Sequence, residues 1–406
     1  MTRNRCYNAS GPDMKNAMIL AGAAIAVIVV AVVLLPLIGP ARLQTTDFVN
    51  FYVGASIVRD GHGAQLYQRP VQDQAFQAAL GHPSPQYFLH PAFEAAAFVP
   101  LTYLGMERAF ALWSLINVGL LSLLPLVLTG CIPLVDRRPY LALSGFCLLP
   151  ALTALTLGQD SILLLVLLAA SYALAQRKKD LAAGLVLSLL SIKFQYLAIL
   201  LPLLLWSRKW RTATGIGTGC AALAMVSAWI TGWSGQLEYV AFLRDFNAHS
   251  GYGALNPTLM VNGRGFLAGM GVTAHATAYA VLASALLVGL AAASEGARSH
   301  DRRLQWALSI TVALSAAPYA HFPDMTVLLL PVLLALDHIV KVGTGTFSRK
   351  LLALCCLAVF LWPFALLVLG GHYWWNSRIY WVFPLIALFA ATLAAELHSN
   401  RSRARE

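Results

Sequence analysis

The charged residues of this chain fall in the gaps between long apolar runs, which extend from Asn16 to Leu397. An apolar run of about 20 residues can cross a bilayer as a helix, because in lipid every backbone polar group must be bonded within its own segment. Only 11% of the residues are charged and 59% are hydrophobic, whereas a soluble domain has roughly 25% charged residues. We therefore expect an all-α polytopic membrane protein, with residues 1–406 forming one integral membrane domain.

The apolar runs predict about twelve transmembrane helices. Their approximate limits are 16–38, 108–130, 138–156, 160–176, 181–192, 195–207, 212–232, 273–294, 304–319, 323–340, 350–370 and 380–397. The fifth and sixth runs meet at Lys193. They form either a tight hairpin or one long helix with Lys193 inside it, and the second alternative reduces the count to eleven and moves the later loops to the other side.

The distribution of Lys and Arg favours the hairpin, because basic residues are retained on the cytoplasmic side. With twelve spans, 20 of the 28 Lys and Arg residues lie on the side that also holds both termini. One long helix would instead place the clusters around Arg298 and Lys341 on the outer side. The expected location is the cell inner (plasma) membrane, with cytoplasmic N- and C-termini.

Two outer segments are long, 39–107 and 232–272. The first contains the amphipathic stretches Val49 to Val58 and Ala92 to Tyr103, which are expected to form helices in the interfacial plane. The net charge of +11 is concentrated at the membrane borders, where it meets anionic lipid. Membrane lipids, and not nucleic acid, are therefore the expected partners.

The six cysteines have neither the spacing of metal ligands nor that of a disulfide framework. The sequence therefore predicts no metal-binding residues and no cofactor. It does not exclude an activity that depends on a divalent metal ion.

Polar residues that are unusual beside membrane spans gather on the predicted outer side. They are Asp47, Asn50, Tyr52, His90, Gln159, Asp160, Lys193, Asn256, Arg264, His321, Asp324 and Arg378. Ionisable residues at membrane depth are costly and commonly functional. Structural alternatives stay open, since Asp47 and Asp160 could cap helices, Lys193 could extend to the headgroups, and His321 and Asp324 could satisfy each other. His90-Pro91 could be a simple turn.

A group-transfer site at a membrane surface needs three kinds of group. A carboxylate takes a proton from the attacking hydroxyl, and Asp47 is the candidate. Cations hold the charge that develops on a phosphate leaving group, and the candidates are Lys193, Arg264, His321 and Arg378. The remaining residues, Asn50, Tyr52, His90, Gln159, Asp160, Asn256 and Asp324, are candidates for substrate binding.

The ordered set of motifs resembles glycosyltransferase family 87. The first-loop signature is Thr46-Asp47-Phe48-Val49-Asn50-Phe51-Tyr52, with Tyr87-Phe88-Leu89-His90-Pro91 later in the loop. Leu157-Gly158-Gln159-Asp160-Ser161, Ser191-Ile192-Lys193-Phe194 and Arg208-Lys209-Trp210-Arg211 continue it in order, and the likeness covers roughly residues 44 to 340. The sequence departs from the family pattern at His90 and Phe194, where the family often has proline.

This resemblance implies a GT-C fold and a polyprenyl-phosphate-linked sugar donor, commonly mannose. It implies inverting transfer on the extracytoplasmic face to a hydroxyl of a lipid or glycan acceptor, with Asp47 at the position of the family's base. Similar members are polyprenol-phosphate-mannose-dependent α-mannosyltransferases of glycolipid biosynthesis.

Two other functions are compatible with the sequence. A multi-pass lipid or solute transporter would place its charged residues near the membrane midplane on broken helices and show paired repeats. A periplasmic-face polymer ligase or acyltransferase would favour an outer loop rich in Arg and His, without the Asp-Phe opening. The one-sided cluster of polar residues favours the glycosyltransferase.

Overall fold

The computed structural model describes residues 43–82, 86–248, 257–272, 301–369 and 378–403. Within these ranges the chain is helical, and its only β-type contact is an isolated bridge between Met260 and His321. The α-helices are α3 (Phe48–Arg59), α4 (Arg69–Leu80), α5 (Ala92–Phe98), α6 (Met106–Leu128), α7 (Pro133–Arg137), α8 (Tyr140–Leu143), α9 (Leu149–Leu157), α10 (Ser161–Gln176), α11 (Asp180–Ser188), α12 (Phe194–Trp206), α13 (Trp210–Ala248), α14 (Gly263–Gly269), α16 (Arg302–Ala316), α17 (Leu329–Val342), α18 (Phe347–Leu369) and α19 (Phe383–Arg403). Short 3-10 helices are η3 (Gly63–Gln65), η4 (Val99–Leu104), η5 (Ser144–Cys147), η6 (Leu189–Lys193), η8 (Pro257–Leu259), η9 (Phe322–Leu328) and η11 (Ile379–Val382).

Six helical segments of the described chain are long and apolar enough to cross a membrane, or up to seven if the bent pair Tyr140–Cys147 and Leu149–Leu157 is one span. The all-helical membrane architecture is therefore confirmed, whereas the predicted count of twelve is not. The predicted spans 16–38 and 273–294 lie outside the described residues. Large apolar side chains also face outward, among them Trp229 at 88% and Trp233 at 77% exposure, as expected of helices whose surroundings are lipid.

The segment Asp180–Trp206 is long enough for a single span, but its path reverses at Lys193. Lys193 has the non-helical backbone angles φ −122° and ψ 70° and stands between η6 and α12. Asp180 from the start of α11 and Ser207 just after α12 line the same small cavity. Because the two ends of the segment lie together, α11 and α12 form a hairpin whose tip carries Lys193.

Glycines allow α13 to approach α11 closely. A Cβ on Gly184 would lie 2.1 Å from the carbonyl oxygen of Thr212, and one on Gly215 would lie 2.3 Å from that of Leu181. Small residues at such contacts let the helix backbones touch, which is the usual way that membrane helices associate. After its contact with α11, α13 breaks at Gly232, where φ is 71°, and continues as a helix through Ala248. The first part of the predicted outer segment 232–272 is therefore helical.

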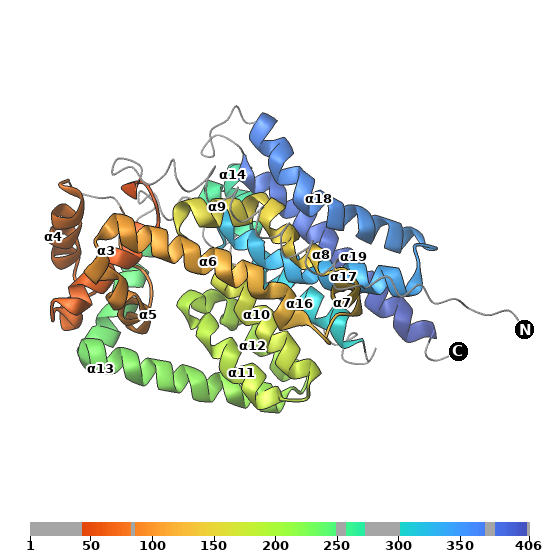
Figure 1. Ribbon diagram of the computed structural model, residues 1–406, viewed down its shortest axis with the longest axis horizontal. Helices are drawn as coiled ribbons and strands as arrows, with labels where there is room; N and C mark the ends of the chain where they lie inside the picture. The colour runs from red at the N-terminus through yellow and green to blue at the C-terminus, as the bar shows by residue number, and fades with distance from the viewer. Residues whose placement is uncertain (1–42, 83–85, 249–256, 273–300, 370–377, 404–406) are drawn as a thin grey trace, which may run out of the picture.

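The buried apolar residues form two clusters. The larger occupies the centre of the bundle, where α10, α16, α17 and α19 pack together. The smaller joins α3, α5 and the start of α6 to the last turns of α13, where Phe242 and Phe246 pack near Tyr87 at ring distances of 6.1 and 5.9 Å. Figure 1 shows α3, α4 and α5 gathered at one end of the long axis.

The amphipathic stretch Val49 to Val58 is helical and lies within α3. Every residue of α3 is buried or half-buried, so α3 is an internal element of the smaller cluster. The residues that pack against α3 belong to α4, α5 and η4. The helix that follows Asp47 is thus held on several sides by protein.

Candidate active site

Asp47 directly precedes α3, but its side chain does not cap that helix. The Asp47 backbone is in the right-handed helical region, with φ −70° and ψ −19°, and its carboxylate accepts no hydrogen bond from the first turn. The carboxylate instead accepts a hydrogen bond of 2.6 Å from the side-chain amide of Gln159. The capping alternative for Asp47 is therefore wrong, and the carboxylate is directed to a residue of another element.

Gln159 reaches Asp47 because of the turn between α9 and α10. Gly158 ends α9 in the left-handed conformation, with φ +66°, which glycine adopts without the steric cost of a Cβ. A Cβ at Gly158 would also lie 2.7 Å from the Cβ of Phe48 and 3.0 Å from the Phe110 ring. The Gly158 carbonyl accepts a hydrogen bond of 2.9 Å from the indole of Trp113. The turn is thus packed directly against the start of α3.

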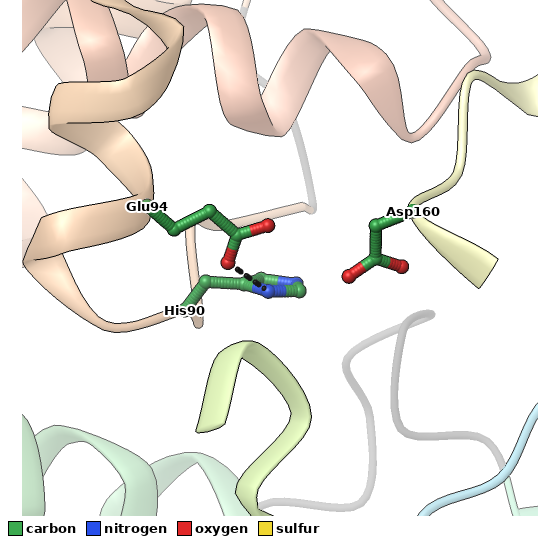
Figure 2. Close-up of side chains that lie close together, drawn as sticks. All are labelled: His90, Glu94 and Asp160. Carbon is green, nitrogen blue, oxygen red and sulfur yellow. Dashed lines mark ion pairs between the residues drawn. The ribbon is translucent and has the colours of Figure 1, made fainter. Parts of the chain in front are cut away.

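Asp160 follows Gln159 at the start of α10, and its carboxylate does not cap α10 either. It lies fully buried near a second acidic residue, Glu94, and the imidazole of His90. Figure 2 shows the His90 ring between the two carboxylates, and Nδ1 of His90 lies 2.7 Å from an oxygen of Glu94.

His90 and Glu94 lie four residues apart, with Pro91 leading into α5 between them. Burial raises the pKa of Glu94. Burial alone would lower the pKa of His90, but the attraction of Glu94 for the imidazolium outweighs it, and the net shift of the His90 pKa is upward. The half-buried ring of His90 is therefore paired with a buried carboxylate, and His90 is more than part of a turn.

His90, Glu94 and Asp160 are also the described residues whose types and spacing could hold a metal ion. One ligand atom from each lies within 4.8 Å of the others, and imidazole with two carboxylates is a common donor set for divalent transition metals. A cation here would have to share Asp160 with the ammonium of Lys193, which already lies 2.7 Å from it.

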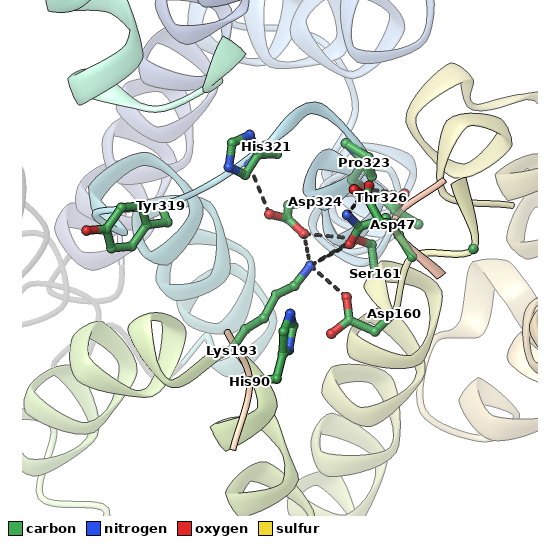
Figure 3. A network of polar contacts seen from close by, with 12 residues as sticks. Asp47, His90, Asp160, Ser161, Lys193, Tyr319, His321, Pro323, Asp324 and Thr326 are labelled. Atoms are coloured by element: carbon green, nitrogen blue, oxygen red, sulfur yellow. Dashed lines mark hydrogen bonds and ion pairs between the residues drawn. The ribbon is translucent and has the colours of Figure 1, made fainter. Parts of the chain in front are cut away.

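Lys193 is the centre of the polar network in Figure 3. Its ammonium nitrogen lies 2.7 Å from an oxygen of Asp160 and 2.6 Å from Oδ1 of Asp324. It also donates to the side-chain oxygen of Gln159 at 3.3 Å and to the hydroxyl of Ser161 at 3.4 Å. Because Lys193 is 8% exposed and its two carboxylate partners are 0% and 2% exposed, it is ion-paired inside the protein and does not extend to the membrane surface.

Asp324 joins the network to the loop between α16 and η9. Its second oxygen accepts a hydrogen bond of 3.0 Å from the backbone N–H of His321, and the His321 side chain completes a capping box at the start of η9. Asp324 Oδ1 also accepts a bond of 2.8 Å from the hydroxyl of Ser161. Asp324 and His321 therefore do satisfy each other, and Asp324 binds Lys193 as well.

The Gln159 side chain connects Asp47 to this buried network. Its N–H₂ group donates to Asp47 while its oxygen accepts from Lys193, so its orientation is fixed from both sides. Burial raises the pKa of Asp47 above its usual value, and the Gln159 hydrogen bond and the charges of His321 and Lys193 act in the opposite direction. A carboxylate with a raised pKa is a stronger base in its ionised form, as general base catalysis requires.

The other cationic candidates lie outside this network. Arg264 on α14 is 8% exposed, and its guanidinium lies 5.1 Å from the centre of the Tyr319 ring. Arg378 is exposed at the start of η11, and η11 packs on α14, where a Cβ on Gly269 would lie 2.4 Å from the Tyr380 ring. Arg264 and Arg378 therefore lie on neighbouring elements, and Arg264 contacts the loop that carries Tyr319.

Three predicted substrate-binding residues are placed differently. Tyr52 donates its hydroxyl to the carbonyl of Thr102 at 3.4 Å. Asn50 is half-buried, and its side-chain oxygen has no hydrogen-bond partner among the described residues. Asn256 lies outside the described residues. Neither Asn50 nor Tyr52 contributes a contact to the network around Lys193.

Two members of the cluster are absent from the sequence-based candidates, Glu94 and Ser161. Glu94 stands in an apolar stretch four residues after His90, the spacing at which two side chains meet on a helix. That spacing, and the rarity of a glutamate in such a stretch, was the available signal. Ser161 has no comparable signal, because a serine at the start of a helix is common for local reasons.

The comparison with protein-family models gives one match, to glycosyltransferase family 87 over residues 88–331. No curated protein and no solved structure matches the chain. The matched range contains His90, Gln159, Asp160, Lys193 and Asp324, and Asp47 precedes it. Because the match covers more than half of the 406 residues, the protein belongs to glycosyltransferase family 87.

Proposed function

We propose that this glycosyltransferase transfers a sugar, most simply mannose, from a polyprenyl-phosphate donor to a hydroxyl of a lipid or glycan acceptor. One observation carries this proposal: the Asp47 carboxylate is turned away from its own helix and held by Gln159 at 2.6 Å. A half-buried carboxylate in a fixed orientation, with burial raising its pKa, is suited to accept a proton from an attacking hydroxyl.

In the proposed reaction the acceptor hydroxyl gives its proton to Asp47, and its oxygen forms a bond to the anomeric carbon. The bond from that carbon to the phosphate oxygen breaks, and the electron pair leaves with the polyprenyl phosphate. Attack opposite the leaving group inverts the anomeric configuration. The overall chain fold in this proposal is GT-C.

The charge on the leaving phosphate has to be held by cations, and Lys193, Arg264, His321 and Arg378 remain the proposed group. The charge of Lys193 is shared with Asp160 and Asp324, so its contribution to phosphate binding is smaller than that of a free ammonium. Arg264 has a planar fork suited to phosphate oxygens, and Arg378 lies on the adjoining element. The residues that would contact the sugar or shape its site are His90, Gln159, Asp160, Asp324, Asn50, Tyr52 and Asn256.

The proposed side of the reaction is extracytoplasmic. The support is the distribution of basic residues, of which 20 of 28 fall on the side opposite the site when twelve spans are counted. A lipid-linked donor agrees with such a side, because its hydrocarbon chain carries the activated sugar within the membrane.

The direct test is a transfer assay with the purified protein, polyprenyl-phosphate-mannose and a panel of lipid acceptors. We expect transfer from the lipid donor, an inverted anomeric linkage by NMR, and none from a nucleotide sugar. Transfer from the nucleotide sugar alone would contradict the proposal. Facilitated movement of the donor across a vesicle membrane without any transfer would indicate the transporter alternative.

The cationic site has its own test in the dependence of the rate on donor concentration. Charge-assisted contacts to a phosphate are among the stronger hydrogen bonds, so Arg264→Ala and Lys193→Ala should raise the KM for the donor more than the KM for the acceptor. Arg108→Ala is a matched control, because Arg108 is an exposed cation at the start of α6. An unchanged KM for the donor in both variants would indicate that His321 and Arg378 bind the phosphate instead.

A further inference from the structure

His90, Glu94 and Asp160 come together from two distant parts of the chain. His90 and Pro91 lead into α5, Glu94 lies in the first turn of α5, and Asp160 directly precedes α10. Figure 2 shows the imidazole between the two carboxylates. One nitrogen or oxygen atom of each side chain lies within 4.8 Å of one atom from each of the others.

This spacing is close to that of ligands around a single ion. Atoms that all lie within 4.8 Å of one another are no more than about 2.8 Å from a common point, whereas imidazole and carboxylate ligands lie about 2.0–2.2 Å from an ion such as Zn²⁺. Each side chain would have to move by less than about 1 Å to reach that distance. A small rotation about side-chain bonds supplies such a movement without a change in the backbone.

Asp160 has one oxygen available for such an ion. Its Oδ1 lies 2.7 Å from the ammonium nitrogen of Lys193, whereas its Oδ2 is buried and has no hydrogen-bond partner among the described residues. A buried carboxylate oxygen without a partner is costly. An ion on Oδ2 would share Asp160 with Lys193, and the lysine would fix the orientation of the carboxylate, as the groups around metal ligands commonly do.

His90 and Glu94 are close to each other without being aligned. Nδ1 of His90 lies 2.7 Å from Oε2 of Glu94, but neither atom forms a hydrogen bond within the described part of the chain. Two ligands of the same metal ion have this relationship, because each directs a lone pair at the ion and not at the other ligand.

The buried polar network also holds more negative than positive charge. Its carboxylates are those of Asp47, Glu94, Asp160 and Asp324. Lys193 is its one lysine, and even with His90 and His321 both protonated the described part of the network keeps an excess of negative charge. Because buried charge without a counter-charge is costly, this excess attracts a cation.

The set of ligand atoms selects among cations. One imidazole nitrogen with two carboxylates is typical of sites for divalent transition metals, whereas Ca²⁺ and Mg²⁺ are bound mainly by oxygen atoms. His90 is half-buried while Glu94 and Asp160 are buried, so an ion would enter past the ring of His90. Three protein ligands leave further positions on the ion open to water.

We propose that His90, Glu94 and Asp160 bind one divalent transition-metal ion, of which Mn²⁺ is the representative used as a probe. The ion joins the loop before α5 to the start of α10, next to the Gln159 side chain that holds Asp47. The site is defined by ion binding alone, so it does not depend on the proposed transfer reaction.

The test is Mn²⁺ binding to the purified full-length protein, without an affinity tag and after treatment with a chelator. The EPR signal of free Mn²⁺ gives the bound fraction, and pulsed EPR detects the coupling of bound Mn²⁺ to an imidazole nitrogen. We expect one bound ion per chain with this nitrogen coupling, displaced by Zn²⁺ or Co²⁺ but not by the same concentration of Mg²⁺. Because the ion binds the folded chain, Mn²⁺ should also raise the temperature of thermal unfolding.

Two variants test the ligands. Glu94→Gln keeps the size of the side chain and removes its charge, and it should weaken Mn²⁺ binding by at least about tenfold. His90→Asn should abolish the nitrogen coupling. The matched controls are Glu107→Gln and His62→Asn, which change an exposed glutamate at the start of α6 and an exposed histidine after α3. Both controls should keep the binding of the wild-type protein.

Two results would overturn the metal site. The first is a wild-type protein that binds no Mn²⁺, or binds it without coupling to a nitrogen, and this result does not depend on whether any variant folds. The second is an equal loss of affinity in Glu94→Gln and Glu107→Gln, which would assign the ion to carboxylates at the surface.

Discussion

The side-chain amide of Gln159 donates a hydrogen bond of 2.6 Å to the carboxylate of Asp47, although the two residues lie 112 positions apart. The same amide group accepts from Lys193 at 3.3 Å. One neutral side chain thus couples the proposed base to a buried lysine and its two carboxylates. The relationship makes Gln159 a positioning residue whose loss should affect both the geometry and the ionisation of Asp47.

Gln159→Leu removes this coupling while keeping most of the side-chain volume. We expect a decrease in the transfer rate of up to roughly 100-fold, the scale for a displaced catalytic group. The hydrogen bond from Gln159 lowers the pKa of Asp47, so its removal raises that pKa further. Because the base acts when ionised, the acidic limb of the pH–rate profile should move to higher pH.

The control for this variant is Gln195→Leu, since Gln195 donates to the Tyr319 carbonyl and does not touch Asp47. It should leave the acidic limb in place. If the acidic limb of the pH–rate profile does not shift in Gln159→Leu, then Gln159 does not influence the ionisation of Asp47, whatever the change in rate.

Lys193→Met should destabilise the protein by roughly 3–5 kcal/mol, the usual cost of leaving buried carboxylates without their cation. The variant leaves Asp160 and Asp324, which are 0% and 2% exposed, without an ammonium. Thermal unfolding in detergent measures the loss. The triple variant Lys193→Met, Asp160→Asn, Asp324→Asn removes all three charges and should recover most of the stability; a triple variant less stable than the single one would show that the charges are not paired as described.

Gly158→Ala should disturb the contact between the α9–α10 turn and the start of α3. The added Cβ would lie 2.7 Å from the Cβ of Phe48, at a residue with φ +66°, and such overpacking costs about 1–3 kcal/mol. We expect reduced stability together with a slower transfer rate, since Gln159 and Asp47 flank the contact. Gly119→Ala on α6 is the control, because no atom lies within 4 Å of its added Cβ; equal effects at the two positions would contradict this role for Gly158.

The side of the membrane can be measured by cysteine labelling in intact cells, in a variant that lacks the natural cysteines. Gln77 is exposed on α4, in the same predicted outer segment as Asp47, and Lys178 is exposed just after the end of α10 that is opposite Asp160. A cysteine at position 77 should react with an impermeant thiol reagent, and one at position 178 should react only after permeabilisation. The reverse pattern would overturn the extracytoplasmic site.

The convergence of residues from distant segments could be predicted from the sequence. Four residues were expected on one side of the membrane. Asp47 lies in the first outer segment, and Gln159, Lys193 and Asp324 stand where apolar runs begin or end. The structure brings these four into one network. The alternation of Lys and Arg clusters between the runs also indicated the reversal at Lys193.

The contacts within that network could not be predicted. The sequence left Asp47 and Asp160 free to be helix caps, because Asp before a helix has the same local pattern whether its carboxylate turns inward or outward. The orientation of Asp47 depends on Gln159 and that of Asp160 on Lys193, and both partners are distant in sequence. The packing of α3 against α4, α5 and η4 is likewise set by contacts between distant residues, such as the stacked rings of Phe51 and Phe98 at 5.0 Å, which the residues of α3 alone do not specify.

The most direct measurement is the turnover of Asp47→Asn in the transfer assay with a polyprenyl-phosphate-sugar donor. The asparagine keeps the size of the side chain and can still bind Gln159, but it cannot accept the proton. We expect normal folding and donor binding with a loss of roughly 2 to 4 orders of magnitude in rate, the scale of general base catalysis. Turnover near that of the wild-type protein would show that Asp47 is not the base.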